Sequence, residues 1–374
     1  MKLIHISDLH IGKRLYGYDL EDDQRYILRQ IIEIIESEKP DAVLIAGDVY
    51  DRADPSATAV RIFDDFLSML ASTGVESFII YGNHDSGQRV AYGSRLFDKT
   101  GIHFSPVYDE EMTHEVLTDE FGPVNIYMLP YLRSVDAVEA LAAADVDESE
   151  RNVIVSHQFV TSAVLGDSEE MNIGTLDNID ESCYSAFDYA ALGHIHMPQA
   201  ISPEPGKDAV IRYSGSPLAY SFSESDMIPK SVTVVEMKEK GVTDIQTIEL
   251  EPLHKMRTIK GQFAELISDE GLIEKCKNDY LKVILTDDRG ILDAMAKLQA
   301  VFGNVMTLEY EYMRRQDADV TIDSVHTEGT PRELFEALYG EQHGGKEMDD
   351  FQKEVLDKLI AEVFDRQEAE DEAD

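Results

Sequence analysis

Five short motifs hold the side chains of this chain whose types and spacing could do chemistry. In chain order they read SDLH, GDVYD, GNHD, SH and GHIH, and they begin at residues 7, 47, 82, 156 and 193. Carboxylate and amide oxygens mixed with neutral imidazoles are ligands that suit Mn²⁺, Fe²⁺ or Zn²⁺. No cysteine stands in these motifs, which argues against a structural zinc site.

The motifs supply more candidate ligands than one ion needs. There are seven, namely Asp8, His10, Asp48, Asn83, His157, His194 and His196. This number suits two ions that share a bridging carboxylate. Two metal ions roughly 3.5 to 4 Å apart can activate a water molecule and stabilise the entering and leaving oxygens of a phosphoryl displacement. The motifs therefore predict a two-metal centre.

Each motif also has an ordinary structural interpretation. A single Asp-x-His or His-x-His pair is more often structural or simply on the surface. Glycines after strands are common turn residues. Five ligand-type motifs in succession, each after a predicted strand, nevertheless favour a site over coincidence.

The motifs follow apolar runs that predict β-strands. The first three runs are Lys2–Ile6, Ala42–Ala46 and Ser77–Tyr81. Between the first two, apolar residues at positions 27, 28, 31, 32 and 35 share one helical face, so the chain starts as a β-α-β unit. The carboxyl ends of strands gather at one edge of an open α/β sheet, where the five motifs can converge.

A second helix and six further strands are predicted from the same kinds of apolar pattern. A second helix is predicted with Asp54 as its N-cap and Pro55 as its first residue. Its buried stripe is Val60, Phe63, Phe66, Leu67 and Leu70. More strands are predicted over residues 125–129, 152–155, 189–192, 210–213, 231–237 and 245–250. This order predicts an α/β fold in which layered sheets are flanked by helices.

Length and composition limit the class of protein. The 374 residues leave room for two domains, and 43% hydrophobic residues suit a folded globular chain. No apolar run reaches the length of a membrane span and no signal stretch opens the chain, so we expect no membrane contact and a cytoplasmic protein. Cys183 and Cys276 lie far apart, which suits a reducing compartment and buried structural roles.

The net charge of −41 is unusual for a protein that handles phosphates. An acidic surface repels nucleic acid and slows association with it. The acid is unevenly placed, because residues 108–150 hold twelve carboxylates and one Arg. Such blocks usually form a solvated face or a frayed tail, so the charge does not decide the function.

The pattern changes beyond Leu250, which predicts a domain boundary near Pro252. Strands are predicted over Thr258–Leu266, Tyr280–Leu285 and Val305–Tyr312, and a helix between the last two is lined by Leu292, Met295, Leu298 and Phe302. Two short amphipathic helices follow. The first opens at Pro331 with Leu334, Phe335, Leu338 and Tyr339, and after Gly344-Gly345 the second carries Phe351, Val355, Leu359 and Val363. They either dock on their own domain or bind a partner.

DLH, GDVYDR, GNHD, SH and GHIH, in that order, resemble the motifs of the calcineurin-like metallophosphoesterases. The longer forms HISDLHIGKR, YGNHDSG, ALGHIHMPQ and YSGSPLAYSFSE resemble the SbcD family of bacterial nucleases in particular. This resemblance covers nearly the whole chain. It implies two Mn²⁺ ions, with Mg²⁺, Fe²⁺ or Zn²⁺ as other possible occupants.

The resemblance also assigns roles residue by residue. It implies that one ion is held by Asp8, His10 and His196, the other by Asn83, His157 and His194, and that Asp48 bridges them. His84 stays off the metals and supplies a proton to the leaving oxygen. The Asp51 carboxylate orients His84, although a loop-capping role is equally open from the residues alone. Asp85 receives no role. Basic residues near the motifs are candidates for DNA backbone contacts or ordinary surface, namely Lys13, Arg14, Arg52 and Arg89.

The family resemblance divides the chain into three parts: a phosphoesterase domain over residues 1–252, a capping domain over 253–326, and C-terminal helices over 327–374. In such proteins the C-terminal helices bind SbcC, an ATPase, in an expected heterotetramer, and the phosphoesterase domains form a homodimer. The implied activity is ATP-dependent 3′ to 5′ exonuclease on double-strand ends and endonuclease on hairpins and blocked ends, in DNA repair, recombination and replication. Two alternatives remain: a phosphatase or cyclic-nucleotide phosphodiesterase of the same fold, and a non-catalytic DNA-end scaffold.

Overall fold

The first three apolar runs of the chain form parallel neighbouring strands in one sheet. In the computed structural model, which describes residues 1–164, 178–201 and 209–312 and scattered positions between 332 and 360, they are β1 (Lys2–Ile6), β4 (Ala42–Ala46) and β5 (Glu76–Ile80). With β6 (Ile102–Phe104), β15 (Ser231–Met237) and β16 (Thr243–Glu249), the order is β16-β15-β1-β4-β5-β6. Ile6 lies opposite Ile45, and Ala46 opposite Ile80. The first three motifs therefore begin at the same edge.

A second six-stranded sheet carries the last two motifs. Its order is β13-β14-β12-β9-β8-β7, made of β7 (Thr113–Asp119), β8 (Gly122–Leu129), β9 (Arg151–His157), β12 (Tyr189–Gly193), β13 (Gln199–Ile201) and β14 (Val210–Tyr213). The four central strands are parallel. Gly193 lies opposite His157, which puts the SH and GHIH motifs side by side.

The two sheets pack face to face over an apolar layer. Leu3, Leu44 and Phe78 from the first sheet lie in one buried cluster with Ile126 and Val155 from the second. The neighbouring residues on the same strands, such as Ile4 and Val43, point to the opposite face and pack with the helices. These strands are buried on both faces, which is why they read as continuous apolar runs in the sequence.

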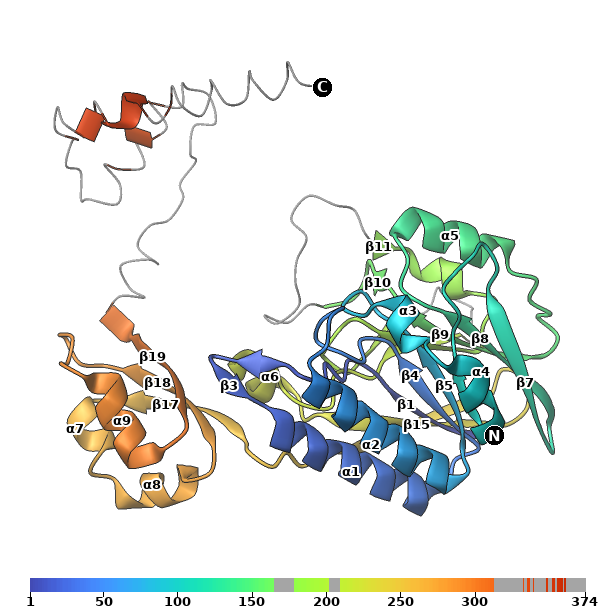
Figure 1. Cartoon of the computed structure of the whole chain (residues 1–374), viewed down its shortest axis with the longest axis horizontal. Coiled ribbons are helices and arrows are strands. Elements are labelled where there is room, and N and C mark those ends of the chain that lie inside the picture. Colours follow the sequence, from blue (N-terminus) through green and yellow to red (C-terminus); the bar gives the residue numbers. More distant parts are fainter. Residues whose placement is uncertain are drawn as a thin grey trace. The chain divides into compact units, whose positions relative to one another are not determined.

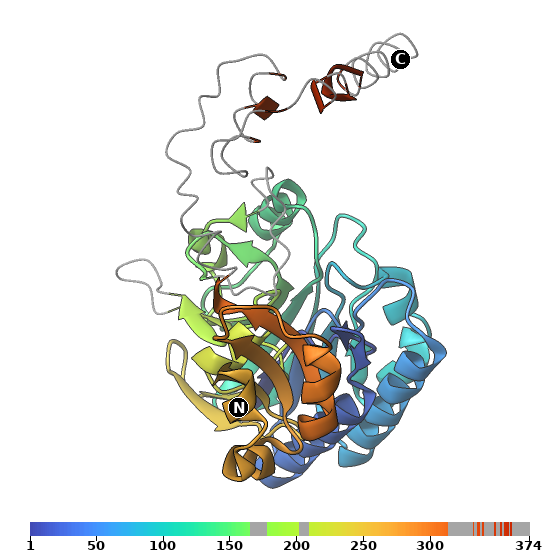
Figure 2. The same ribbon diagram turned by 90° about the vertical axis from the view of Figure 1, so that its left-hand side faces the viewer.

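Helices cover the outer faces of both sheets. α1 (Glu21–Glu38) and α2 (Ala57–Thr73) lie side by side over the first sheet (Figures 1 and 2), and α5 (Ser134–Ala143) packs on the second. The predicted face of α1, from Ile27 to Ile35, is buried. The predicted α/β fold with layered sheets and flanking helices is confirmed.

The start of α2 differs from the prediction. Its N-cap is Ser56, whose hydroxyl accepts a hydrogen bond from the Ala59 N–H at 3.1 Å. Asp54 lies before the helix, and its carboxylate forms an ion pair with Arg89. The helix therefore begins at Ala57, and Val60 turns outward with 45% exposure. The rest of the predicted stripe is buried.

Short elements fill the connections. They are β2 (Arg14–Leu15), β3 (Tyr18–Asp19), α3 (Gly87–Val90), α4 (Ser94–Phe97), the 3₁₀ turn η1 (Asp98–Thr100), β10 (Phe159–Val160), β11 (Asn178–Ile179), the 3₁₀ turn η2 (Glu181–Tyr184) and α6 (Phe222–Met227). Ser221 caps α6 by accepting a hydrogen bond from the Glu224 N–H at 3.2 Å.

The elements beyond Pro252 form a three-stranded sheet with short helices. They are β17 (Met256–Gly261), α7 (Phe263–Leu266), α8 (Glu270–Cys276), β18 (Tyr280–Leu285), α9 (Ala294–Phe302) and β19 (Val305–Tyr310). The strand predicted over Thr258–Leu266 is wrong in its second half. Asp287 accepts a hydrogen bond from the Phe263 N–H at 2.8 Å, and a helical turn replaces the strand. Leu292 precedes α9 and is 79% exposed.

The chain divides into two compact units. One comprises residues 1–259, 264–283 and 293–308, and the other comprises 260–263, 284–292 and 309–374. Of the predicted C-terminal helices, Phe335, Tyr339 and Val355 are described and helical, with Phe335 45% and Val355 39% exposed. Pro331, Leu334, Leu338, Gly344, Gly345, Phe351, Leu359 and Val363 lie outside the described residues, as do residues 313–326 of the predicted capping domain. Within the described part, no helix is long and apolar enough to cross a membrane.

Candidate metal centre

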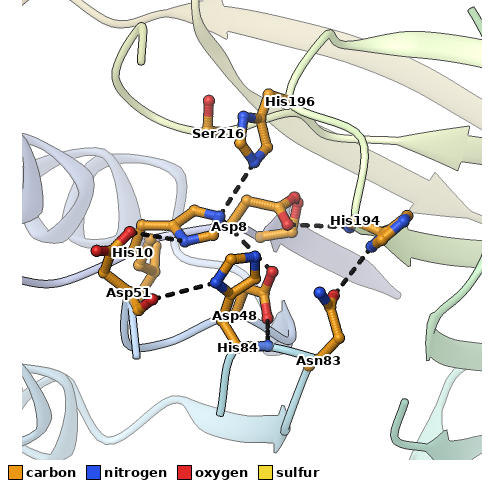
Figure 3. A network of polar contacts seen from close by, with 12 residues as sticks. Asp8, His10, Asp48, Asp51, Asn83, His84, His194, His196 and Ser216 are labelled. Atoms are coloured by element: carbon orange, nitrogen blue, oxygen red, sulfur yellow. Dashed lines mark hydrogen bonds and ion pairs between the residues drawn. The ribbon is translucent and has the colours of Figure 1, made fainter. Parts of the chain in front are cut away.

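The predicted ligands of the first ion meet at one point. Asp8, His10 and His196 each offer a ligand atom, and these atoms lie within 4.8 Å of one another. His10 Nε2 and His196 Nε2 are 3.0 Å apart. All three residues are buried, and Figure 3 shows their side chains turned toward a common space.

The predicted ligands of the second ion lie beside the first group. The Asn83 amide oxygen is 3.0 Å from both His157 Nε2 and His194 Nδ1. Asp48 connects the groups, because its carboxylate lies 3.6 Å from His10 Nε2 and 3.3 Å from His157 Nε2. A ligand atom of Asp8 also lies within 4.8 Å of Asp48 and His157 ligand atoms. The structure thus brings all seven predicted ligands together.

His84 lies at the edge of this group. Its main-chain N–H donates to Asp48 at 2.9 Å, and its ring lies edge-on to His10 with centroids 4.9 Å apart. Its ring nitrogen is also close enough to His10 and Asp48 to be a ligand by geometry alone. The predicted contact from the Asp51 carboxylate is not the one observed. The Asp51 main-chain carbonyl accepts from His84 Nδ1 at 3.1 Å instead (Figure 3).

The Asp51 carboxylate is occupied elsewhere. It lies 2.7 Å from Lys13 Nζ and 3.7 Å from His10 Nδ1. Asp51 therefore contacts two histidines of the group, His84 through its backbone and His10 through its side chain. The sequence suggested only the first, and it assigned the wrong atom.

The backbone at several candidate ligands is strained. Asp8, His10, Asp48 and His194 have φ of 54°, 43°, 48° and 98°. Residues other than glycine rarely adopt positive φ, and such conformations cluster at functional sites where the surrounding fold enforces them. The backbone after these strands therefore adopts an unfavourable conformation that orients the candidate ligands toward one another. A turn with only a structural role would not require this strain.

Two glycines make room for the candidate ligands. A Cβ on Gly82 would collide with the Asp48 carboxylate, and one on Gly193 would collide with the Ala46 carbonyl and lie 2.7 Å from His157 Nδ1. The glycines beside the motifs are therefore packing requirements of the centre and not only turn residues.

Burial and mutual attraction set the protonation of the group. Burial lowers the pKa of His10 well below its ordinary value and, together with nearby His157, lowers that of His194 to about 3. Burial disfavours the charged form of Asp48. Electrostatic attraction to His157 and a hydrogen bond from it nevertheless hold the pKa of Asp48 well below that of an ordinary aspartate. Burial likewise opposes the charge of His157, and Asp48 raises its pKa to about 9. Burial raises the pKa of Asp8.

The donor set fits divalent metal ions. The ligand atoms face one another directly. His10 Nε2 and His196 Nε2, for example, are 3.0 Å apart with no protein atom between them. Two carboxylates, one amide oxygen and four imidazoles are ligands of intermediate hardness, suited to Mn²⁺, Fe²⁺ or Zn²⁺. Buried acidic and basic groups in this number are rarely stable without an ion or strong pairing.

Comparisons with known proteins agree with this geometry. The family model for the calcineurin-like phosphoesterases matches residues 1–198, which contain all five motifs. A second model, described as the type 5 capsule protein repressor C-terminal domain, matches residues 252–343. The chain is 32% identical over 328 residues to the SbcD subunit of nuclease SbcCD from Staphylococcus saprophyticus, with 82% of this chain and 84% of the relative covered. It is 28% identical to the protein of the same name from Staphylococcus epidermidis, with 89% and 95% covered.

The chain belongs to the SbcD family of calcineurin-like phosphoesterases. It is therefore a metal-binding hydrolase that acts on phosphodiester bonds, a nuclease of the SbcCD type. Among solved structures, a dimetal phosphatase from Danio rerio covers 67% of this chain and 99% of its own, at 14% identity and a TM-score of 0.43. That likeness is too low to add to the family assignment.

The SbcD-like motif YSGSPLAYSFSE contributes residues that the sequence did not assign. Tyr220 donates to the Leu9 carbonyl at 2.6 Å, and its ring packs against those of His10 and His196. Ser214 lies 2.9 Å from the Ser7 hydroxyl, which in turn donates to Asp8 at 2.5 Å. The motif was visible in the sequence, but these roles depend on contacts between residues about two hundred positions apart.

Asp85, which had no predicted role, holds two motifs together. Its carboxylate accepts hydrogen bonds from the main-chain N–H groups of Gly82, Val49 and Tyr50, at 3.0, 3.0 and 2.8 Å. Burial and the nearby Asp48 charge nevertheless raise the pKa of Asp85 to about 7. The final Asp of GNHD thus fixes the GDVYD loop against the GNHD loop.

The four predicted DNA contacts differ in availability. Lys13 is engaged with Asp51 and is 19% exposed, whereas Arg52 is 81% exposed beside the same carboxylate. Arg14 donates to the Gly17 carbonyl at 2.9 Å. Arg89 is held by Asp54 and donates to the Ala53 carbonyl at 2.8 Å. Arg52 therefore has a more exposed side chain than Lys13 or Arg89.

Proposed function

We propose that this chain is the nuclease subunit of an SbcCD-type complex and cleaves DNA with two divalent metal ions. The observation that carries the proposal is the convergence of seven donor residues, five of them buried, from the strand ends of two sheets. Relatives over most of the chain are named as subunits of this nuclease. Mn²⁺ is the proposed ion, with Mg²⁺, Fe²⁺ or Zn²⁺ as alternatives.

Each candidate ligand has a proposed place. Asp8, His10 and His196 would hold one ion, Asn83, His157 and His194 would hold the other, and Asp48 would serve both. When bound, the two ions would supply Lewis-acid chemistry, activating a water molecule and stabilising the negative charge that develops on the transferred phosphoryl group. The strained strand ends keep these side chains oriented before substrate arrives, so little reorganisation is needed during the reaction.

His84 is the proposed general acid. Its Nδ1–H donates to the Asp51 carbonyl at 3.1 Å, which leaves Nε2 as the atom that exchanges a proton with the leaving oxygen. Asp51 positions His84 through this carbonyl. As the P–O bond breaks, the doubly protonated ring gives its Nε2 proton to the departing alkoxide and is left as the neutral Nδ1–H tautomer.

DNA contacts and domain roles complete the proposal. Lys13, Arg14, Arg52 and Arg89 contact the phosphate backbone near the centre. Residues 1–252 form the phosphoesterase domain, 253–326 cap the approach of DNA, and 327–374 bind the SbcC ATPase within a heterotetramer containing a dimer of this chain. The proposed substrates are double-strand ends and hairpins in the cytoplasm. Digestion runs 3′ to 5′ under ATP control and serves repair, recombination and replication.

The test is cleavage of an end-labelled linear duplex and of a hairpin by the purified chain. Each substrate is incubated with Mn²⁺, Mg²⁺ or EDTA, with and without SbcC and ATP. We expect cutting with Mn²⁺ that EDTA abolishes and that SbcC with ATP stimulates. An Asn83→Ala variant is the matched inactive control, because it removes one amide oxygen shared by His157 and His194.

Two other outcomes would replace the proposal. Hydrolysis of a small nitrophenyl diester without any cutting of DNA would identify a phosphatase or cyclic-nucleotide phosphodiesterase. Binding to SbcC and to DNA ends without metal-dependent cleavage would identify a DNA-end scaffold.

A further inference from the structure

A buried ion pair lies directly behind His196. Glu224, on α6, is 1% exposed, and Lys230, just before β15, is 8% exposed. Lys230 Nζ donates to the Glu224 carboxylate at 2.6 Å, to the Ser216 hydroxyl at 2.9 Å and to the His196 carbonyl at 2.8 Å. All three ammonium protons are thus used, and one of them fixes the backbone of a candidate ligand.

The second carboxylate oxygen of Glu224 faces the His196 ring. Glu224 Oε1 lies 3.6 Å from His196 Nδ1. On the other side of the ring, Nε2 faces the centre and lies 3.0 Å from His10 Nε2. A carboxylate on one side of an imidazole favours the tautomer that carries its proton there, which leaves the opposite nitrogen as a lone-pair donor.

The same arrangement recurs at His10. Asp51 Oδ1 lies 3.7 Å from His10 Nδ1, so each of the two facing histidines has a carboxylate behind it. Lys13 lies 2.7 Å from Asp51, just as Lys230 lies 2.6 Å from Glu224. Two Lys–carboxylate–His chains therefore end at histidines whose Nε2 atoms lie 3.0 Å apart.

Stability alone does not account for the Glu224–Lys230 pair. Removing two charges from water costs free energy that their attraction often fails to recover, and well-packed apolar replacements are often as stable or more stable. The pair also contacts the centre directly, because Lys230 donates its third hydrogen bond to the main-chain carbonyl of His196, a candidate ligand. This combination favours a role in the centre over a role in folding only.

We propose that Glu224 is a positioning residue that, with Lys230, holds His196 with Nε2 directed at the metal ion. This inference rests on the proposed function, because it concerns a ligand of the first ion. Lys230 keeps Glu224 in place and clamps the His196 carbonyl. Glu224 sets the ring tautomer. Neither residue contacts the substrate.

Glu224→Gln is the decisive variant. Lys230 requires an acceptor, so the Gln carbonyl turns to Lys230 and the Gln amide N–H₂ faces His196 Nδ1. That contact favours the tautomer with the proton on Nε2, which removes the lone pair meant for the ion. Asp244→Asn is the matched control, since it removes a carboxylate that is 60% exposed on β16 and paired only with Lys238 at 3.4 Å among the ion pairs of the described residues.

Two measurements test the proposal without activity. Nitrogen-15 NMR of the histidine rings in the metal-free protein, assigned with a His196→Asn variant, reports the His196 tautomer. We expect the Nδ1–H form in the parent chain and in Asp244→Asn, and the Nε2–H form in Glu224→Gln. Calorimetric titration with Mn²⁺ should then give about 10- to 100-fold weaker binding of one ion in Glu224→Gln. The titration is done below the melting temperature of each metal-free protein, which falls in Glu224→Gln because the buried Lys230 charge loses its partner.

The outcomes separate this inference from the proposed function. An unchanged His196 tautomer together with unchanged Mn²⁺ affinity in Glu224→Gln overturns the positioning role. Failure of the parent chain to bind Mn²⁺ overturns the proposed function, whatever the tautomer. If Glu224→Gln does not fold, the double variant Glu224→Met, Lys230→Met leaves no unpaired buried charge. It should fold and still bind one ion more weakly, and full affinity there would contradict us.

Discussion

The histidines of the centre are distinguished by what occupies their Nδ1 atoms. His157 Nδ1 donates to the Ala46 carbonyl at 2.8 Å, and His84 Nδ1 donates to the Asp51 carbonyl at 3.1 Å. His196 Nδ1 faces the Glu224 carboxylate. In each of these three cases Nε2 remains available. For His157 it lies 3.0 Å from the Asn83 amide oxygen and for His196 it lies 3.0 Å from His10 Nε2, whereas His84 Nε2 is the nitrogen proposed to exchange a proton. Identical side chains can therefore take different roles.

This difference predicts separate effects for His84 and Asp48. His84→Ala should keep the affinity for both Mn²⁺ ions and lower the cleavage rate by roughly 10² to 10⁴-fold, because it removes a proton donor. Asp48→Ala should weaken the binding of both ions, because Asp48 lies between the two groups of ligands. Calorimetric titration with Mn²⁺ and single-turnover cleavage of labelled duplex measure the two quantities.

His84→Ala removes the imidazole ring but keeps the main chain of residue 84, so it tests the ring alone. The Asp48 contact comes from the His84 N–H, which survives substitution by alanine, so the position of Asp48 should not change. Equal loss of Mn²⁺ in His84→Ala and Asp48→Ala would contradict the division of roles. It would make His84 a ligand, which its distance from His10 and Asp48 also permits.

At the scale of elements, His5 joins the two sheets. It is fully buried on β1, and its Nδ1 lies 2.8 Å from the Tyr189 hydroxyl on β12 of the second sheet. Burial, together with nearby Arg212, lowers the pKa of His5 to about 3. The folded protein therefore keeps this histidine neutral in conditions where an unfolded chain would protonate it.

Stability should consequently fall as the solution becomes acidic. The pKa is 6.5 in the unfolded reference and about 3 in the fold, so the contribution of His5 is complete above about pH 6.5 and is lost between pH 6.5 and 3. Between pH 7 and pH 5 the expected loss is about 2 kcal/mol. Urea unfolding of the metal-free chain at both pH values measures it.

His5→Phe is the comparison for this prediction. It keeps an aromatic ring between the sheets and removes the titrating group, so its free energy of unfolding should fall less between pH 7 and pH 5 than that of the parent chain. The other histidines contribute equally to both proteins. An identical pH dependence in the two proteins would show that His5 titrates normally in the fold.

The elements were predictable wherever local pattern decides the structure. β1, β4, β14 and β15 occupy the predicted residues, because strands buried on both faces are continuous apolar runs. The start of α2 was not predictable from Asp54-Pro55, since Asp54 forms its ion pair with Arg89 thirty-five positions away. The strand predicted up to Leu266 ended early because a side chain from a later loop, Asp287, binds the Phe263 N–H.

At the candidate metal centre, too, the sequence did not reveal the features that depend on contacts between distant residues. Its seven candidate ligands were visible because each follows a strand in a compact motif. Glu224 and Lys230 were not assigned, because their proximity to His196 depends on the tertiary path of the Ser216–Glu224 segment, whose Tyr220 and Phe222 pack in the buried cluster of the first sheet. Positive φ at Asp8 and Asp48 also has no signal in the sequence. Motif spacing identifies candidates, whereas the surrounding fold decides which atom each one presents.

At the scale of the whole molecule, the charge of −41 opposes the approach of DNA. Part of the acid lies away from the centre, as at Asp119 of the edge strand β7 (Thr113–Asp119), whose carboxylate pairs with the N-terminal ammonium at the end of β1 opposite the first motif. Distant charges act through the solvent and are screened by salt, whereas contacts at the centre act at short range. Two divalent ions would also add four positive charges at the centre itself.

Salt should therefore affect this nuclease differently from a basic DNA-binding protein. Raising KCl from about 10 mM to about 100 mM shortens the screening length from about 30 Å to about 10 Å, which weakens the repulsion between the acidic surface and DNA. On the proposed function, kcat/KM of the isolated chain on a short duplex with Mn²⁺ should rise or stay level over this range. A small nitrophenyl diester carries one charge, so its hydrolysis should change little. A steep fall in kcat/KM for the duplex alone would instead indicate an extended basic contact with the phosphates, because release of counterions from many such contacts makes binding weaken sharply with salt.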